Sequence, residues 1–226
     1  MNVRHRAKIR GAALGFGVAV VLALAGFARV ARADAPAELP FVNAATAFSS
    51  AAQADRPIDP EVFVRETQAA PGTGPEHIEH VAGFRTARLD DEPQAPIFRA
   101  DGVALDLSLG NWLAARGTLA IEAQPDGHDR VTVVFKNLVA FGEYSVFVEA
   151  AAPAGTPVCR PLDGEGSANS FTAHVDGSAA LVIDTPAQVN SGSAIVLVYH
   201  SDSREHGASR GQIGITAHEQ LVARVP

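Results

Sequence analysis

Apolar and polar residues alternate along several segments in the C-terminal part of the chain. In the segment VALDLSL, which begins at Val103, every second residue is apolar, and TLAIEA, which begins at Thr118, repeats the pattern. A period of two is typical of a β-strand that buries one face and exposes the other. The pattern therefore predicts strands over residues 103–109 and 118–123.

Turn residues separate further segments of β-branched and aromatic residues. Asp126-Gly127 is a hairpin turn signal. The segments RVTVVFKNLV and EYSVFVEA, joined by a short connection that contains Gly142, predict a hairpin. FTAHV and SAALVID, on either side of Asp176-Gly177, predict another. SAIVLVYH is apolar on both faces, which indicates a central strand covered on both sides.

GQIGIT and HEQLVARV supply two more short strands near the C-terminus. The total is eight or nine strands in about 125 residues, at spacings of about 8 to 14, with no convincing amphipathic helix. This spacing predicts an all-β fold, an immunoglobulin-like antiparallel β-sandwich over residues 101–226, with a small barrel as the alternative. Trp112, the only tryptophan, is expected to cover one end of the core.

Residues 34–100 show no sustained hydrophobic period. The first part is rich in Ala, Pro and Ser, and QAAPGTGPEH is a cluster of helix and strand breakers. Short segments at 61–67 and 77–89 fit either strands or short helices. We expect an irregular, partly disordered leader or extension, and the pattern leaves open whether residues 41–100 add strands to the sheets.

Residues 1–33 have the pattern of an export signal. A basic start, MNVRHRAKIR, precedes the apolar segment GAALGFGVAVVLALAGFA, and ARA ends just before Asp34. This order is typical of a signal peptide cleaved after Ala33. The apolar segment has 18 residues, the lower limit for a membrane-spanning helix, so an uncleaved membrane tether is the alternative.

The charge balance excludes some classes of partner. The formal net charge is −7, and cleavage after Ala33 removes six basic residues and no acidic one, which leaves −13. Nucleic acid binding requires a basic face, and an anionic membrane surface would repel the chain. Lysine is scarce after the signal, where Lys136 stands against eleven arginines. Few lysines and many arginines are typical of GC-rich bacterial coding sequences. Together with the export signal, this leads us to interpret the chain as a bacterial protein exported to the periplasm or the cell exterior.

The chain has a single cysteine, Cys159, so it cannot form an internal disulfide. Its segment, TPVCRPLDG, is flanked by prolines and has no electropositive cluster that would activate a thiol. We expect a half-buried small residue, with an intermolecular disulfide as the alternative.

The segment YHSDSREHG, residues 199–207, carries the densest set of metal-ligating side chains. His200, Asp202 and His206 lie in it, and His218 begins the last predicted strand, where it would return to the same end of a sandwich. Imidazoles and a carboxylate suit zinc or copper. The alternative is a solvated loop that uses Ser, Asp and Gly because these residues satisfy turn backbones.

Across about the last hundred residues, the expected architecture and the His and Asp residues resemble the copper-zinc superoxide dismutases, which are β-sandwiches. The closely spaced His-x-His ligand pair of that family is absent, as is its second cysteine. The resemblance therefore assigns no ligand in this chain.

Other catalytic patterns are missing. No Gly-x-Ser-x-Gly elbow occurs, and GEGSANS lacks the Lys-Ser/Thr of a phosphate-binding loop. The sequence therefore favours a non-catalytic binding or structural module of the bacterial cell envelope over an enzyme. Its expected partner is an envelope protein or a small ligand, bound at the end that carries residues 200–212 and 217–218. The alternative is an exported zinc- or copper-binding protein that uses the four residues named above.

Overall fold

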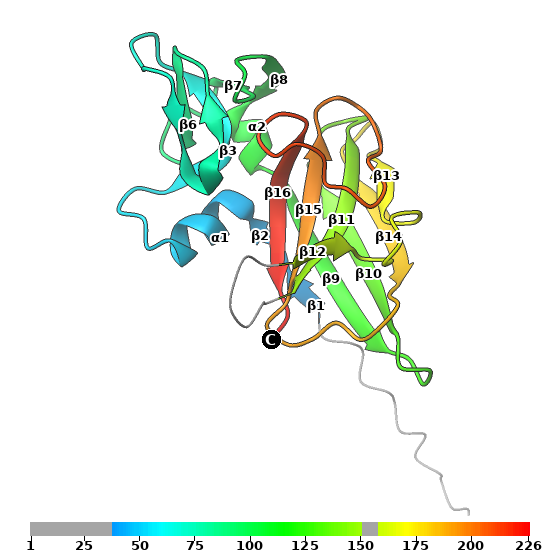
Figure 1. Ribbon diagram of the computed structural model, residues 1–226. Coiled ribbons are helices and arrows are strands. Elements are labelled where there is room, and N and C mark those ends of the chain that lie inside the picture. Colours follow the sequence, from blue (N-terminus) through cyan, green and yellow to red (C-terminus); the bar gives the residue numbers. More distant parts are fainter. Residues whose placement is uncertain (1–37, 151–157) are drawn as a thin grey trace, which may run out of the picture. The chain divides into compact units, whose positions relative to one another are not determined.

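The computed structural model describes residues 38–150 and 158–226, which form an all-β fold of antiparallel sheets (Figure 1). The predicted signal peptide lies outside these residues. Within the two described ranges, no helix combines the length and the apolar character needed to cross a bilayer. Nine of the strands in the described ranges, β8 to β16, follow residue 101, and eight of them, β9 to β16, belong to the two main sheets. The predicted strand GQIGIT is wrong, since this segment contains only an isolated bridge at Ile213.

Two sheets enclose the main core. The first has the order β1-β9-β10-β14, and the second has the order β12-β11-β15-β16-β2, with β13 also paired to β11. The strands of the first sheet are β1 (Glu38–Pro40), β9 (Arg116–Ala123), β10 (Asp129–Lys136) and β14 (Ala179–Asp184). The strands of the second are β2 (Val42–Asn43), β11 (Glu143–Ala150), β12 (Val158–Pro161), β13 (Ser170–Thr172), β15 (Ala194–His200) and β16 (Ala217–Arg224).

Apolar side chains from both sheets meet in one cluster, which gives a sandwich-like arrangement. Val133 and Phe135 of the first sheet pack in the same core as Ile195 and Leu197 of the second. Trp112 lies in this core and is fully buried, as predicted. These large side chains are the main source of hydrophobic stabilisation in this part of the molecule.

Strand β15 is central and buried along its whole length, which confirms the prediction made from SAIVLVYH. Ile195 and Leu197 face the main core, whereas Val196 and Val198 belong to a second cluster on the opposite face. Ala44 of helix α1 (Ala44–Ala51) packs in that second cluster. A strand covered on both faces has no polar side to reveal its period.

A third sheet and a short hairpin are built mainly from residues that the sequence analysis treated as an irregular leader, with β8 as the exception. The third sheet has the order β6-β3-β7-β8. Its strands are β3 (Ile58–Arg65), β6 (Phe84–Arg88), β7 (Pro96–Phe98) and β8 (Ala104–Ser108). The remaining elements are the hairpin β4 (Gly72–Thr73) and β5 (Glu79–His80), the 3-10 turn η1 (Pro75–His77) and helix α2 (Leu109–Leu113).

The described part of the expected leader, residues 38–100, therefore contains regular structure. Strand β3 is buried continuously from Asp59 to Val64, so it has no alternating pattern, and its two acidic residues hide its apolar character. Strands β1 and β2 pair with β9 and β16, so residues before 101 contribute to both main sheets.

Two predicted hairpins are wrong in their pairing, although their strands exist. β10 pairs with β9 and β14, and β11 pairs with β12, β13 and β15, so β10 and β11 belong to different sheets. β13 and β14 are separated in the same way. The hairpin of β9 and β10 around Gly127 is confirmed.

The strand predicted at 103–109 is shorter and joins the third sheet rather than the sandwich. Asp106 has a φ of 56°, a left-handed conformation that interrupts the alternation of faces. Val103, just before the strand, is half exposed, and Leu109 begins helix α2.

Candidate functional site

His200 ends strand β15 and is fully buried. Its Nε2 lies 2.8 Å from the Oγ of Ser145 on the neighbouring strand β11, and this hydroxyl also contacts the Oγ of Ser170 at 2.8 Å. Nδ1 of His200 is buried and has no hydrogen-bond partner among the described residues. Burial, followed by the proximity of His206, lowers the pKa of His200 to about 4, so the ring is neutral at physiological pH.

His206 and Asp202 lie in the loop that follows β15, next to His200. Nε2 of His206 is 3.2 Å from both carboxylate oxygens of Asp202. The rings of His200 and His206 are 4.8 Å apart between centroids. About a fifth of the His206 and Asp202 side chains is exposed. The structure therefore brings three of the four predicted site residues together.

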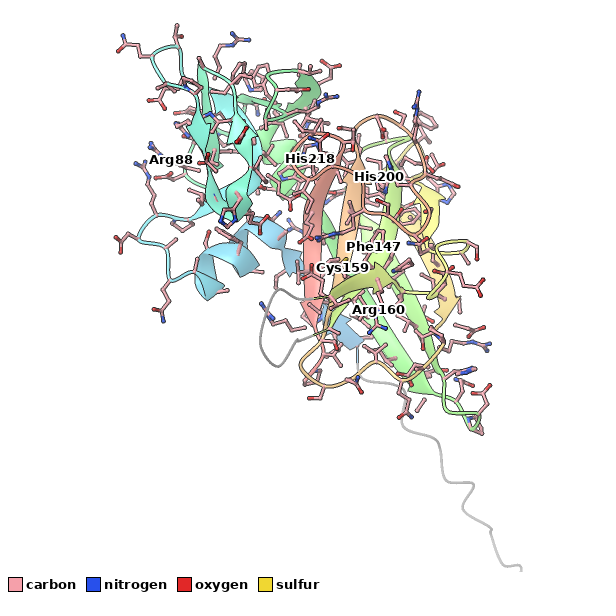
Figure 2. The ribbon with its side chains drawn as sticks, viewed as in Figure 1. Arg88, Phe147, Cys159, Arg160, His200 and His218 are labelled. Atoms are coloured by element: carbon pink, nitrogen blue, oxygen red, sulfur yellow. The ribbon has the colours of Figure 1, made fainter. Side chains whose placement is uncertain are left out.

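His218 lies near the start of β16 and is fully buried, but it faces another set of groups. Figure 2 shows it on the strand beside that of His200. Its Nδ1 lies 3.1 Å from the backbone oxygen of Glu61 on β3, and its Nε2 lies 3.2 Å from Ser201 Oγ. Because a carbonyl only accepts, a neutral His218 donates through Nδ1. Burial lowers the pKa of His218 to about 4.

The four predicted residues do not form a ready-made metal centre. Both nitrogens of His218 are engaged, and Nε2 of His206 faces Asp202. In residues 38–150 and 158–226, no three His, Cys, Asp or Glu side chains are arranged so that they could hold a metal ion.

Ser145 and His200 form a serine–histidine pair, but its setting is unsuited to nucleophilic catalysis. Neither residue has any exposed surface. The second ring nitrogen of His200 has no carboxylate to orient the ring, as a catalytic triad requires. The described geometry therefore gives this pair a structural role.

The structure also gathers a carboxyl cluster, formed by Glu61, Glu76, Glu149 and Glu219 together with Arg210. Glu61 is buried, Glu149 and Glu219 are partly exposed, and Glu76 is exposed. Glu61 Oε2 accepts a 2.6 Å hydrogen bond from the backbone N–H of Glu219, and the carboxyl group of Glu76 lies near that of Glu61. Arg210 forms ion pairs with Glu149 and Glu219. Carboxylates that lie close together repel one another, which favours a proton on one of them.

The pKa values in the carboxyl cluster are raised. Burial, with the nearby Glu219, raises the pKa of Glu61 well above its ordinary value. Burial and the proximity of Glu149 raise the pKa of Glu219 to about 8, against the opposing effect of Arg210. The pKa of Glu76 is raised as well, by partial desolvation of its carboxyl group, although the residue as a whole is exposed. At neutral pH the cluster therefore holds protons that free glutamates would release.

The sequence analysis missed this cluster. The available signal was the presence of acidic residues inside otherwise apolar segments, at Glu61 in EVFV and at Glu219 in HEQLV. Charged residues are seldom buried without a partner. An acid within a strongly apolar strand is thus a sign of an internal polar network.

Cys159 lies half-buried on β12 beside this cluster. Burial raises the pKa of its thiol to about 12. A thiol with so high a pKa is almost entirely protonated at neutral pH and is a weak nucleophile.

The chain was compared with known proteins at the level of families, sequences and structures. No protein-family model, curated protein or solved structure matches it. The functional argument therefore depends on the burial, contacts and charges of the described residues.

Proposed function

We propose that the chain is an exported, non-catalytic binding or structural module of the bacterial cell envelope, with an immunoglobulin-like β-sandwich as its framework. The observation that carries the proposal is the complete burial of His200 and His218, with Ser145 beside the first and the Glu61 backbone beside the second. Groups that are removed from solvent and engaged in the fold position strands and do not meet substrates.

Tyr144 supports the immunoglobulin-like assignment. It lies near the start of β11, and its hydroxyl oxygen accepts a 2.9 Å hydrogen bond from the backbone N–H of Val139, five residues upstream. The hydroxyl also donates to Gln220 Oε1 on β16 at 3.1 Å. A tyrosine that bonds back to the preceding corner in this way resembles the tyrosine corner of Greek-key sandwiches.

The loop at residues 201–212 is the recognition surface in this proposal. Ser203, Arg204 and Glu205 are exposed at its tip. The base of the loop is held by Ser201, whose hydroxyl proton is shared between the backbone oxygen of Ile215 at 2.8 Å and the Nε2 of the neutral His218 at 3.2 Å. An exposed tip on an anchored base is the arrangement by which sandwich domains present recognition loops.

Two measurements on the full chain, expressed in a bacterium, test the proposal. Intact-mass analysis of the exported protein is expected to give a chain that begins at Asp34, and a retained N-terminus would support a membrane tether instead. A photoreactive residue at Arg204 is expected to give a discrete cross-linked partner that the same residue at Asp126, in the β9–β10 turn, does not give. Equal labelling at both positions, or none at Arg204, would contradict the recognition role of the loop.

A specific observation favours zinc or copper binding as a second candidate. His200 Nδ1 is buried and unpartnered in the described structure, beside the ring of His206 and the Asp202 carboxylate. Two imidazoles and one carboxylate are a donor set that these ions accept, once His206 turns away from Asp202. His218 is left out of this set because both of its nitrogens are engaged.

Calorimetric titration with Zn²⁺ and Cu²⁺ tests the second candidate in protein purified without a chelator or an affinity tag. Stoichiometric binding that is lost in His206→Ala and in Asp202→Asn, and kept in the exposed-histidine control His174→Ala, would establish it. Binding that survives both substitutions, or no binding, would remove it.

A further inference from the structure

An open groove is lined by residues between Pro40 and Thr46, at the end of β1, in β2 and in α1, and by residues of β9 and β10. Its volume is about 580 Å³, within the range of about 300–1,000 Å³ that is typical of small-molecule sites. Its apolar lining includes Phe41, Val42 and Val134. Val42 and Val134 are 45% and 41% exposed, so the groove presents apolar surface to solvent.

Two basic side chains line the same groove. Lys136 on β10 stands directly opposite Arg116 on β9 in the antiparallel register. Directly opposed residues of an antiparallel pair project from the same face, and like charges in this arrangement repel. Within the described ranges, neither side chain has an ion pair.

Within the described residues, Arg116 and Lys136 are two unpaired cations in a chain that is acidic overall. The protein has a formal net charge of −7, and Lys136 is its only lysine beyond the predicted signal. Several of its other cations are paired with acids, as Arg130 is with Asp184 on the same sheet. Two unpaired cations placed opposite each other are stabilised when an anion lies between them.

Asn43 adds an unsatisfied donor to the groove. Its Oδ1 accepts from the N–H of Ala45 at 3.0 Å and caps helix α1. Its Nδ2 is buried and has no partner in the described structure, and Asn43 lines the groove. A buried N–H without a partner costs stability, which an acceptor oxygen would recover.

We propose that this groove binds an aliphatic carboxylate, an amphiphile of the fatty-acid type. The carboxylate oxygens accept from Arg116, Lys136 and Asn43, and the hydrocarbon chain covers Phe41, Val42 and Val134. Charge-assisted hydrogen bonds fix the headgroup, and burial of the exposed valines favours the tail. The site goes beyond the proposed function, because it is separate from the loop at 201–212 and either can fail alone.

The test is calorimetric titration of the exported full chain with dodecanoate below its micellar concentration. One ligand per chain is expected. Binding is expected to weaken about tenfold or more in Arg116→Gln and in Lys136→Gln, since each removes a charge-assisted contact. Both residues are exposed, so both variants are expected to fold. Arg204→Gln, an exposed arginine in the 201–212 loop, is the matched control and is expected to bind as wild type does.

Two comparison ligands separate the parts of the proposal. Acetate has the headgroup without the chain, and dodecyl maltoside has the same chain with a neutral headgroup. Both are expected to bind at least about tenfold more weakly than dodecanoate, because each lacks one of the two contributions. Equal binding of either ligand, no binding of dodecanoate, or unchanged binding in both variants would overturn the proposal. None of these outcomes bears on cross-linking at Arg204.

Discussion

At the scale of single residues, buried polar side chains connect elements that are distant in sequence. Asp59 on β3 accepts a 2.8 Å hydrogen bond from the Trp112 Nε1–H on α2 and a 3.0 Å bond from the Glu61 N–H. Burial raises the pKa of Asp59 to about 6, and the bond from Trp112 opposes this rise. The indole therefore supports a carboxylate that has little other solvation.

Replacing Trp112 by Phe removes this donor and leaves the Asp59 carboxylate partly unsatisfied. We expect the free energy of unfolding at pH 7 to fall by about 3 kcal/mol, from the lost hydrogen bond and the lost core volume. Urea denaturation followed by circular dichroism measures the change. Adding Asp59→Asn to this variant is expected to restore part of the loss, because the uncompensated charge is gone.

The matched control is Phe141→Leu, since Phe141 is 68% exposed. It is expected to change the free energy of unfolding by less than about 0.5 kcal/mol. A Trp112→Phe protein as stable as the control would show that the contact with Asp59 contributes little.

At the scale of elements, the chain crosses between the two main sheets where the sequence pattern predicted hairpins. The connection from β13 to β14 contains Gly177, which has a φ of 71°. A Cβ atom there would lie 2.5 Å from the backbone oxygen of Leu138, in the other crossing connection. Gly127, in the true hairpin of β9 and β10, also has a positive φ, of 87°, but has open space around it.

These two glycines predict different costs for the same substitution. Gly127→Ala is expected to cost about 1–2 kcal/mol, the price of a left-handed conformation for alanine. Gly177→Ala is expected to cost more, because the methyl group also displaces backbone that joins the two sheets. Thermal unfolding of both variants checks the order, and equal costs would contradict the close approach at Leu138.

The strands after residue 101 are largely predictable, because most of them bury one face and expose the other, and because β15 is a continuous apolar segment. Their partners are not, because alternation specifies a face and not a neighbour. The sequence pattern does not reveal strand β3. Both of its faces are buried, so no alternation appears, and the acidic residues Asp59 and Glu61 lie within it. Lys136 and Arg116 lie opposite each other because of the register between β10 and β9, which the alternation of apolar residues does not specify.

The candidate site, too, could be predicted from the sequence only in part. His200, Asp202 and His206 come together, as expected for residues close in the chain. His218 turns to the backbone of Glu61, in a segment that the sequence left open between a strand and a short helix. Contacts with such a segment have no signature in the local pattern.

At the scale of the whole molecule, buried histidines and buried carboxyl groups have opposite effects on stability as pH changes. The pKa values of His200 and His218 are lowered to about 4, so stability rises with pH between about 4 and 6.5. The pKa values of Glu61 and Glu219 are raised, that of Glu219 to about 8, so stability falls as pH rises from about 4.5 to 8. Above about pH 6.5 the histidines no longer change the stability with pH, so only the carboxyl groups do, and stability falls as pH rises.

The free energy of unfolding is therefore expected to fall by about 2 kcal/mol between pH 6.5 and 8, because over this range the folded state holds about one proton more than the unfolded chain. Glu61→Gln is expected to flatten this decline, because the neutral amide keeps an acceptor for the Glu219 N–H and adds no charge. Glu205→Gln, at an exposed position, is expected to follow the wild-type curve. A pH-independent wild type over this range would contradict the protonated carboxyl cluster.

The central claim is that the histidines that look catalytic or metal-binding are internal parts of an all-β framework. Its most direct test is an NMR titration of the imidazole resonances of the exported protein from pH 8 to pH 4. The account predicts that His200 and His218 stay neutral to below about pH 5. Titration of His200 and His218 near 6.5 would place them in solvent and contradict the account.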